Sequence, residues 1–283
     1  MDAADADVLM IGCGDLGSRI GLRLAERGHR VLALRRRAEL VPAPLHGVSV
    51  DLTHEVPDLP ALELRHLVVA LTARPRSEEA YRATYVDGMR RALDAVEAAG
   101  RLPERALLIS STGVHGDVPD GTLVDESHAP SPKDGPARVL LEAEELFASR
   151  VPGGTVLRCS GLYGGQRPRL VDKVAAGDVG DPDRWTNRIH RDDAAAAAVH
   201  LLTRPEPPEP VYLGNDDEPA LMGDVAAEIA RRLGVAPPPR PDPRKAHGKR
   251  ISNARLRATG WVPAYPTYRE GYVTDAPAGP TAH

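Results

Sequence analysis

A glycine-rich loop directly after a short apolar run constrains this chain more than any other feature. Residues 8–11 (VLMI) are followed by residues 12–17 (GCGDLG), which match the pattern G-x-G-x-x-G. Apolar residues then recur every four positions until Gly28, which predicts a helix that ends there. A strand, a tight turn and a helix in this order predict a loop that binds the pyrophosphate of a dinucleotide.

Each position of this loop has an expected role. Gly12 permits the tight turn, Gly14 lets the backbone approach the pyrophosphate, and Gly17 lets the helix pack closely on the strand. We expect Asp15 and Leu16, at the start of the helix, to contact the cofactor as well. A glycine turn without a ligand is the alternative.

Strand-like apolar runs alternate with helical patterns up to about residue 165. This alternation predicts an α/β fold, a Rossmann-type doubly wound parallel sheet. Proline-rich segments interrupt the second half and predict a smaller, discontinuous substrate domain. We therefore expect an NADP-binding domain over residues 1–165, with a return strand near 189–215, and a substrate-binding or lid region over 166–283. The expected strands are 8–11, 31–34, 48–50, 67–71, 106–109 and 155–157, and the main helices are 78–99 and 139–149.

The end of the second expected strand indicates which dinucleotide binds. An NAD site usually has an acidic residue here, whereas this chain has Arg35, Arg36 and Arg37 and no carboxylate before Glu39. Guanidinium groups suit a 2′-phosphate, so Arg35 and Arg36 favour NADP(H) over NAD(H). A solvated arginine cluster in an arginine-rich chain is the alternative.

Two further strand ends are predicted to contact the cofactor. Asp51 and Leu52 follow the third strand, where a carboxylate can accept a hydrogen bond from the adenine amino group. Leu71 and Thr72 end the fourth strand at the carboxyl edge, where the ligands of open sheets bind. For Leu71, burial in the strand explains the residue equally well.

Four later motifs, in this order, resemble one family. Residues 110–116 (SSTGVHG), 158–164 (RCSGLYG) and 188–193 (RIHRDD) resemble stretches of the extended short-chain dehydrogenase/reductases. Residues 252–261 are similar to the C-terminal region of an atypical bacterial subgroup, usually called NAD(P)-dependent epimerase/dehydratase-like. The resemblance covers nearly the whole chain.

The resemblance implies roles for several residues. It implies that the Ser111 hydroxyl assists catalysis and that Ser110, beside it, lies at the cofactor. It further implies that Cys159, Ser160 and Leu162 border the nicotinamide and that the C-terminal half covers the substrate.

One departure from the family matters more than these matches. The family normally has Y-x-x-x-K at the start of the next helix, where the tyrosine transfers a proton and the lysine lowers its pKa. In this chain these positions fall on Pro136 and Leu140. No tyrosine lies between Tyr85 and Tyr163, so the pair is missing.

Three residues are candidates for the catalytic role. Ser111 can contact the reacting group, although a serine at a strand end often bonds the backbone instead. His115 has a suitable ordinary pKa of about 6.5, and its alternative is a packed, hydrogen-bonded histidine. Tyr163 can enter the pocket from the neighbouring loop.

A metal site is not expected. His190, Asp192 and Asp193 lie at a predicted helix start, where carboxylates stabilise the helix N-terminus without any metal. Cys13 and Cys159 have no cysteine or histidine partner at motif spacing, so we interpret both as packing residues.

Composition limits the partners. The 283-residue chain has a formal net charge of −4, which argues against nucleic acid, and no apolar run approaches the length of a membrane span. We expect a cytoplasmic protein with a small-molecule substrate and no membrane association, and a homodimer is a candidate assembly.

Three functions stay open. The first is an NADP-dependent oxidoreductase that transfers hydride to or from a carbonyl, imine or activated alkene without the usual Tyr/Lys acid. The second is a non-catalytic NADP-binding sensor or partner module, since binding needs only the loop. The third is a nucleotide-sugar epimerase or dehydratase, as the family label suggests, although the arginines and the missing tyrosine count against it.

Overall fold

The computed structural model describes residues 5–100, 103–116, 118, 121–165 and 169–272. The chain forms two compact units, and their segments interleave along the sequence. Unit 1 comprises residues 1–116, 129–158 and 195–212, and unit 2 comprises 117–128, 159–194 and 213–283. The domain boundary expected near residue 165 lies inside unit 2, because the segment of unit 2 that contains this residue begins at Cys159.

A seven-stranded sheet forms the centre of the dinucleotide-binding fold, in the order β11-β7-β5-β4-β1-β2-β3. Neighbouring strands from β3 to β5 all pair in parallel. The predicted Rossmann-type sheet is therefore confirmed, and β11 falls within the range where a return strand was expected. The strands are β1 (Val8–Ile11), β2 (Val31–Arg35), β3 (His46–Ser49), β4 (His66–Val69), β5 (Arg105–Ser111), β7 (Thr155–Cys159) and β11 (Val211–Gly214).

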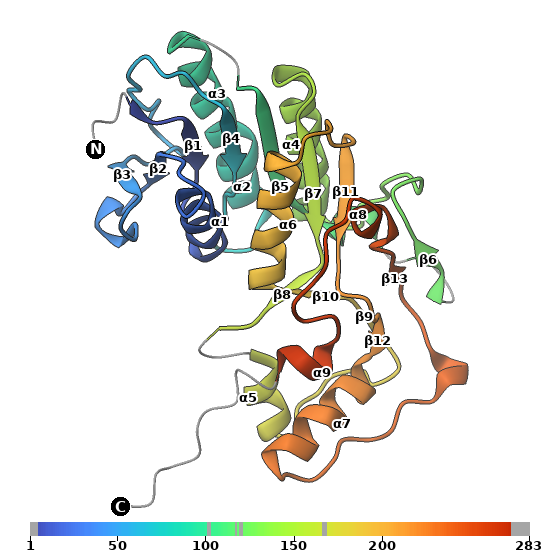
Figure 1. Ribbon diagram of the computed structural model, residues 1–283. Coiled ribbons are helices and arrows are strands. Elements are labelled where there is room, and N and C mark those ends of the chain that lie inside the picture. The colour runs from blue at the N-terminus through green and yellow to red at the C-terminus, as the bar shows by residue number, and fades with distance from the viewer. Residues whose placement is uncertain (1–4, 101–102, 117, 119–120, 166–168, 273–283) are drawn as a thin grey trace, which may run out of the picture. The chain divides into compact units, whose positions relative to one another are not determined.

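Helices cover both faces of this sheet (Figure 1). The buried side chains of α3 (Met89–Ala98) and α4 (Gly135–Arg150) share one apolar cluster with β1, β2, β4 and β5. Figure 1 shows α1 (Asp15–Ala25) and the later part of α6 (Arg191–Thr203) over the other face. Their spacing explains this placement, since α1 buries Gly17, Ile20, Gly21 and Leu24 along one side.

The helix expected over residues 78–99 differs from the prediction in its middle. It runs as α2 (Glu78–Tyr81), a π-helical segment η3 (Arg82–Gly88) and then α3. Such wide turns are rare and frequently occur at functional sites. The helix expected over 139–149 begins earlier, at Gly135, because the Asp134 side chain caps it by accepting from the Ala137 N–H at 2.8 Å.

Unit 2 is built from short elements around its own apolar cluster. That cluster contains residues of α5 (Arg169–Ala175), α7 (Met222–Leu233) and α9 (Tyr268–Gly271). Three two-stranded ladders complete it: β8 (Gly161–Tyr163) with β10 (Arg188–His190), β9 (Trp185–Thr186) with β12 (Ala220–Leu221), and β6 (Leu123–Val124) with β13 (Arg250–Ile251). Unit 2 also contains the 3₁₀ turn η6 (Pro243–Lys245) and the helix α8 (Ala254–Ala258). Unit 1 contains the 3₁₀ turns η2 (Ala38–Leu40) and η4 (Thr112–His115).

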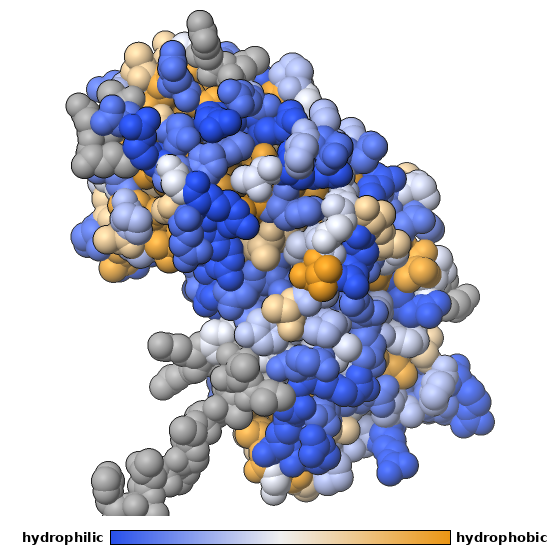
Figure 2. Space-filling view, in the orientation of Figure 1, coloured by the Kyte–Doolittle hydropathy of each residue, from blue (hydrophilic) through white to orange (hydrophobic). Residues whose placement is uncertain are grey.

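Hydrophilic side chains cover most of the face seen in Figure 2, and apolar ones appear there only in small patches. Within the described residues, no helix has both the length and the apolar character that a membrane span requires.

Candidate active site

The glycine loop of unit 1 needs glycine for steric reasons. Gly12 has φ +88°, and a Cβ there would lie 2.7 Å from the Ala70 carbonyl oxygen. A Cβ on Gly17 would lie 2.5 Å from the Gly12 carbonyl oxygen, so α1 and the loop can approach this closely only without a side chain. A leucine at the end of β4, Leu71, also lies against Gly12, which places this strand end beside the loop.

Gly14 is different, because a Cβ there would meet nothing within 4 Å. Helix α1 begins at the next residue, Asp15, and Gly14 at its N-cap supplies no side-chain hydrogen bond. The loop therefore leaves open space in front of the N–H groups of the first helical turn. This arrangement fits the pyrophosphate of a nicotinamide dinucleotide, for which Gly12, Gly14, Gly17 and the N–H groups near Leu16 would form the cradle.

Cys13, inside this loop, is buried with its Sγ 3.4 Å from the Ser18 hydroxyl. Burial raises the pKa of the Cys13 thiol. The thiol therefore stays neutral at neutral pH and acts as a packing group.

The arginines at the end of β2 are not equivalent. The Arg35 guanidinium is half-buried and donates to the Leu40 carbonyl at 2.9 Å, which fixes it against η2. The Arg36 side chain is exposed, and its guanidinium makes no hydrogen bond to any residue that the structure describes. Of the two arginines proposed from the sequence, Arg36 is therefore the one with donors available to an anion, and its charge also acts on the Asp51 carboxylate.

The residues after β3 are held by local contacts. The Asp51 carboxylate accepts from the N–H and the hydroxyl of Thr53, at 3.1 and 2.6 Å, and the Thr53 hydroxyl bond is the main cause that lowers the pKa of Asp51. Leu52 is buried, and its carbonyl accepts from Arg91 at 3.0 Å. At the end of β4, Thr72 is exposed. The predicted contact of Asp51 with adenine and the predicted contacts of Leu52, Leu71 and Thr72 with the cofactor remain predictions.

The two serines at the end of β5 face different surroundings. Ser110 is buried and its hydroxyl donates to Glu144 at 2.5 Å. The half-buried Ser111 hydroxyl accepts from the Gly113 N–H at 3.1 Å and so caps η4. This is the backbone contact that serines at strand ends often make.

Behind these serines lies a buried polar network. Arg158 binds Glu144 through Nε and Nη2, the latter at 2.7 Å, and its Nη1 lies 3.1 Å from His115 Nε2. A guanidinium can only donate, so His115 Nε2 is the acceptor and the imidazole is neutral with its proton on Nδ1. His115 is only 1% exposed. In this structure His115 is hydrogen-bonded to Arg158 in a buried polar network, and its catalytic role remains a prediction.

Unit 2 holds the other residues proposed from the sequence. Tyr163 is buried against the rings of His190 and Tyr272, and its hydroxyl donates to the Thr267 carbonyl at 3.4 Å. Burial raises the pKa of Tyr163, so the group stays protonated. Cys159 and Ser160 are buried in the same unit, whereas Leu162 is 40% exposed.

The carboxylate of Asp193 has a structural role. It accepts the N–H groups of Ala264 and Tyr265 at 2.7 and 2.9 Å and so holds the C-terminal segment of unit 2. His190 Nδ1 accepts from the Asp192 N–H at 3.2 Å. The Asp193 carboxylate is thus occupied by two backbone N–H groups.

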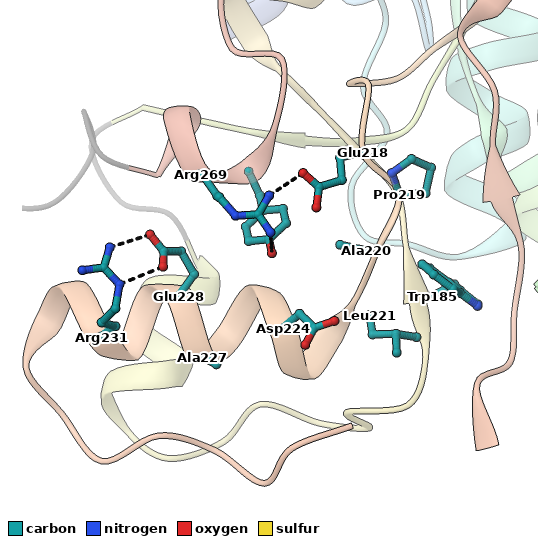
Figure 3. Close-up of a pocket in the computed structure, with 11 residues that line it drawn as sticks. Trp185, Glu218, Pro219, Ala220, Leu221, Asp224, Ala227, Glu228, Arg231 and Arg269 are labelled. Atoms are coloured by element: carbon teal, nitrogen blue, oxygen red, sulfur yellow. Dashed lines mark hydrogen bonds and ion pairs between the residues drawn. The ribbon is translucent and has the colours of Figure 1, made fainter. Parts of the chain in front are cut away.

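Unit 2 also contains a pocket of about 570 Å³, shown in Figure 3. Two ion pairs border it, Glu218 with Arg269 and Glu228 with Arg231, while Asp224 is exposed. The apolar part of the lining comes from Trp185, Pro219, Ala220, Leu221 and Ala227. Apolar surface beside a few polar groups is the usual make-up of a small-molecule site.

A family model for the NAD dependent epimerase/dehydratase family matches residues 8–214. The chain belongs to this family. The predicted resemblance to the extended short-chain dehydrogenase/reductases is therefore confirmed, and with it the prediction of an NAD(P)-dependent enzyme type.

Related proteins agree with this assignment. A structure described as an NAD-dependent epimerase/dehydratase of Methylobacillus flagellatus is 36% identical, with a TM-score of 0.81, and the match covers 94% of this chain and 96% of that one. The UDP-glucose 4-epimerase of Thermus thermophilus, solved with NAD, has 22% identity and a TM-score of 0.73 over 93% and 96% of the two chains, and shows the fold alone. A dTDP-6-deoxy-L-talose 4-dehydrogenase (NAD(P)(+)) of Kitasatospora kifunensis is 30% identical over 56% of this chain. That match spans only 52% of the dehydrogenase.

Helix α4 contains neither a tyrosine nor a lysine. Pro136 lies in the first turn and Leu140 one turn later, at the positions predicted for the missing tyrosine and lysine. The buried pair of Glu144 and Arg158 was not predicted as part of the site. The only signal in the sequence is Arg158, a charged residue inside the apolar run of β7 that requires a partner once it is buried, whereas Glu144 stands among other glutamates and gives no such signal.

Proposed function

We propose that this chain is an NADP-dependent oxidoreductase that interconverts a carbonyl and an alcohol, or an equivalent double bond, on a small organic molecule. One observation carries the proposal. The space at Gly14 is open, and helix α1 begins at the next residue without a side-chain cap. The strand that follows α1 ends in arginines, and no carboxylate precedes Glu39 there. When bound, the nicotinamide supplies or accepts the hydride. The chain's own contribution is to hold the dinucleotide and to orient the substrate.

The preference for NADP rests on Arg36. Its exposed guanidinium has donors to offer a 2′-phosphate, whereas Arg35 is already bound to the Leu40 carbonyl. The carboxylate nearest to this strand end in sequence, Glu39, lies in η2 and comes four residues after Arg35. An arginine here attracts the phosphate, while an acidic residue would repel it.

The substrate class draws on the relatives. One acts on a dTDP-linked deoxysugar, and solved structures of similar fold contain UDP-glucose or UDP-glucuronic acid. The absence of the usual tyrosine and lysine also favours substrates that need little proton transfer to oxygen, such as imines and conjugated alkenes. A panel of dTDP- and UDP-linked 4-keto sugars, enones, imines and aldehydes covers both possibilities.

The first test is a fluorescence titration of the purified protein with NADPH and with NADH. We expect NADPH to bind at least about tenfold more tightly, which corresponds to about 1.4 kcal/mol. The variant Arg36→Ala should remove this difference, and Arg37→Ala serves as the matched control. Equal binding of the two dinucleotides would contradict the NADP preference, and binding of neither would contradict the oxidoreductase. Binding without turnover on the panel would support the sensor instead.

The family and its neighbours favour a second candidate, a nucleotide-sugar epimerase or dehydratase. Such an enzyme retains its dinucleotide and shows no net oxidation or reduction. Release of NAD on denaturing the purified protein, together with conversion of UDP-glucose or a dTDP-hexose without added cofactor, would establish it in place of the oxidoreductase.

A further inference from the structure

The segment from α2 to η3 lies along the first turns of α4. The Glu78 side chain occupies the space where a Cβ on Gly135 would be, at the start of α4. One turn further on, the Arg82 guanidinium binds both carboxylate oxygens of Glu142 at 2.7 and 2.8 Å. These two contacts fix the register of the two helices over the stretch that contains Pro136 and Leu140.

Two tyrosines lie on this segment. Tyr81 and Tyr85 are four residues apart, with their ring centroids 5.1 Å from each other. Both pack on the apolar cluster that includes Val139 of α4, next to Leu140. The segment therefore brings two phenol groups to the part of α4 that lacks a tyrosine of its own.

The Tyr85 hydroxyl lies at the carboxyl edge of the sheet. It lies near the backbone N–H of Ala73, four residues beyond the end of β4, and this N–H partly offsets the rise in the pKa of Tyr85. Val69 of β4 is paired with Leu108 of β5, and β5 continues for three residues to Ser111. Ala73 and Ser111 thus follow neighbouring parallel strands beyond the same edge, where ligands of such sheets bind.

The proton of this hydroxyl is not committed. Among the described residues, the Tyr85 O–H donates no hydrogen bond to a protein acceptor. The side chain is half-buried. Burial and the neighbouring Tyr81 raise the pKa of Tyr85 to about 12, so the phenol is protonated at neutral pH and is available as a donor.

We propose that Tyr85 donates its proton to the substrate's reacting oxygen, in place of the tyrosine that α4 lacks, and that Tyr81 positions its ring. This inference rests on the proposed oxidoreductase function. In the reducing direction, bound NADPH supplies the hydride and both electrons to the carbonyl carbon. As the new C–H bond forms, the C=O π bond breaks and the oxygen takes the Tyr85 proton. Water then returns a proton to the phenolate, so that NADP⁺ and an alcohol are the products.

Tyr85→Phe is the test, because it removes the hydroxyl and keeps the ring. The assay uses NADPH with the 4-keto sugar nucleotide or aldehyde that the wild-type protein reduces fastest. We expect kcat to fall by about 100-fold, the lower limit typical of a lost general acid, with KM and the Kd for NADPH changed less than about twofold. Tyr81→Phe should lower kcat by less, about threefold to tenfold. Tyr212→Phe on β11 is the matched control, because its hydroxyl accepts from the Glu209 N–H just before that strand, and it should leave kcat unchanged.

A spectroscopic readout does not depend on turnover. Alkaline titration of the phenolate absorbance should show one late-titrating tyrosine fewer in Tyr85→Phe than in the wild-type protein, where the buried Tyr163 also titrates late. The solvent isotope effect on kcat is a separate kinetic readout, and it should change in Tyr85→Phe because water then has to supply the proton in place of the phenol.

Several results would overturn the inference. The first is a kcat for Tyr85→Phe within about threefold of the wild-type value. The second is a loss of kcat of about 100-fold in Tyr163→Phe in place of Tyr85→Phe. The third is a loss of NADPH binding in Tyr85→Phe, which would give Tyr85 a structural role. In each of these cases the wild-type protein still binds NADPH and turns over, so the proposed function stands. If the wild-type protein itself binds no NADPH or reduces nothing on the panel, the proposed function fails and the inference fails with it.

Discussion

Arg158 in unit 1 and Arg188 in unit 2 are both almost fully buried, and their surroundings differ. Arg158 binds the Glu144 carboxylate in a bidentate manner, and the same carboxylate accepts from Ser110. Its remaining nitrogen, Nη1, binds His115. Every charged group in this part of unit 1 therefore has a direct partner of the right kind.

Arg188 has a less complete set of partners. Its Nη2 donates to the Thr186 hydroxyl, while Nη1 has no hydrogen-bond partner among the described residues. Asp216 is 1% exposed, and its N–H donates to the Arg188 carbonyl at 2.7 Å, but its Oδ2 also has no partner in the described part of the chain. Burial raises the pKa of Asp216 to about 8, although the Arg188 charge opposes this.

The difference predicts how each unit responds to the loss of a buried charge and to a change of pH. A buried ion pair with all of its hydrogen bonds is a structural device, and removing one partner is costly. A buried carboxyl whose charge is not compensated remains protonated over much of the pH range, so the stability of its unit depends on pH. Four variants or titrations sharpen this comparison.

Removing the charge of Glu144 should have the largest effect. Glu144→Gln leaves the buried Arg158 without its anion, and we expect a loss of about 3 kcal/mol in the free energy of unfolding. Urea unfolding followed by far-UV circular dichroism measures it. Glu142→Gln is the matched control, because Glu142 forms an exposed pair with Arg82 and should cost at most about 1 kcal/mol. A loss below about 1 kcal/mol in Glu144→Gln would remove the contrast between the two units.

Asp216 should give unit 2 a pH dependence of opposite sense to that of an ordinary salt bridge. Its folded-state pKa of about 8 lies above the unfolded value, so the folded state holds a proton that the unfolded chain has lost. Stability is therefore full below about pH 4 and falls as the pH rises from 4 to 8, by something on the order of 3 kcal/mol.

Tryptophan fluorescence can follow this change in unit 2 alone, because both tryptophans, Trp185 and Trp261, belong to that unit. Urea midpoints at pH 5 and pH 8 should differ in the wild-type protein and coincide in Asp216→Asn. An unchanged pH slope in the variant would show that Asp216 is ionised in the folded state.

His66 should give unit 1 the opposite slope. Burial, with the nearby His29 and Arg65, lowers the pKa of His66 to about 4. The unfolded chain then binds a proton that the folded chain does not, so stability falls as the pH drops from about 6.5 to 4. We expect a loss on the order of 2 kcal/mol. Circular dichroism at pH 7 and pH 4.5 measures it, with His66→Asn as the test and the exposed His54→Asn as control. A pH slope retained in His66→Asn would assign it to another group.

The sequence predicted the sheet well because its signals are local. The buried run of β1, the glycines at positions 12 and 17, and the amphipathic spacing of α1 are all determined by a few neighbouring residues. For the same reason, the loss of a tyrosine and lysine from α4 could be read directly from positions 136 and 140.

Contacts between distant segments could not be predicted in this way. The short strand β6 belongs to unit 2 because it pairs with β13, more than 120 residues later. Arg158 meets Glu144 only because β7 and α4 pack at one particular register. Tyr85 likewise packs on the apolar cluster shared with α4 only because two helices far apart in sequence lie together. The register between two packed elements depends on how the whole faces of helices and strands fit together, and it cannot be predicted from a local sequence pattern.

The smallest effect concerns how the two units begin their longest helices. In unit 1, α4 starts with Asp134, whose carboxylate accepts from the Ala137 N–H, while α7 in unit 2 starts at Leu221 without a side-chain cap. Asp134→Ala should therefore cost unit 1 about 1 kcal/mol, and Asp134→Ser, which keeps an acceptor, should restore most of it. Arg76→Ala removes only the exposed ion pair to Asp134 and is the control. If Arg76→Ala matched Asp134→Ala, the ion pair would be the stabilising contact, and α4 would begin without a cap, as α7 does.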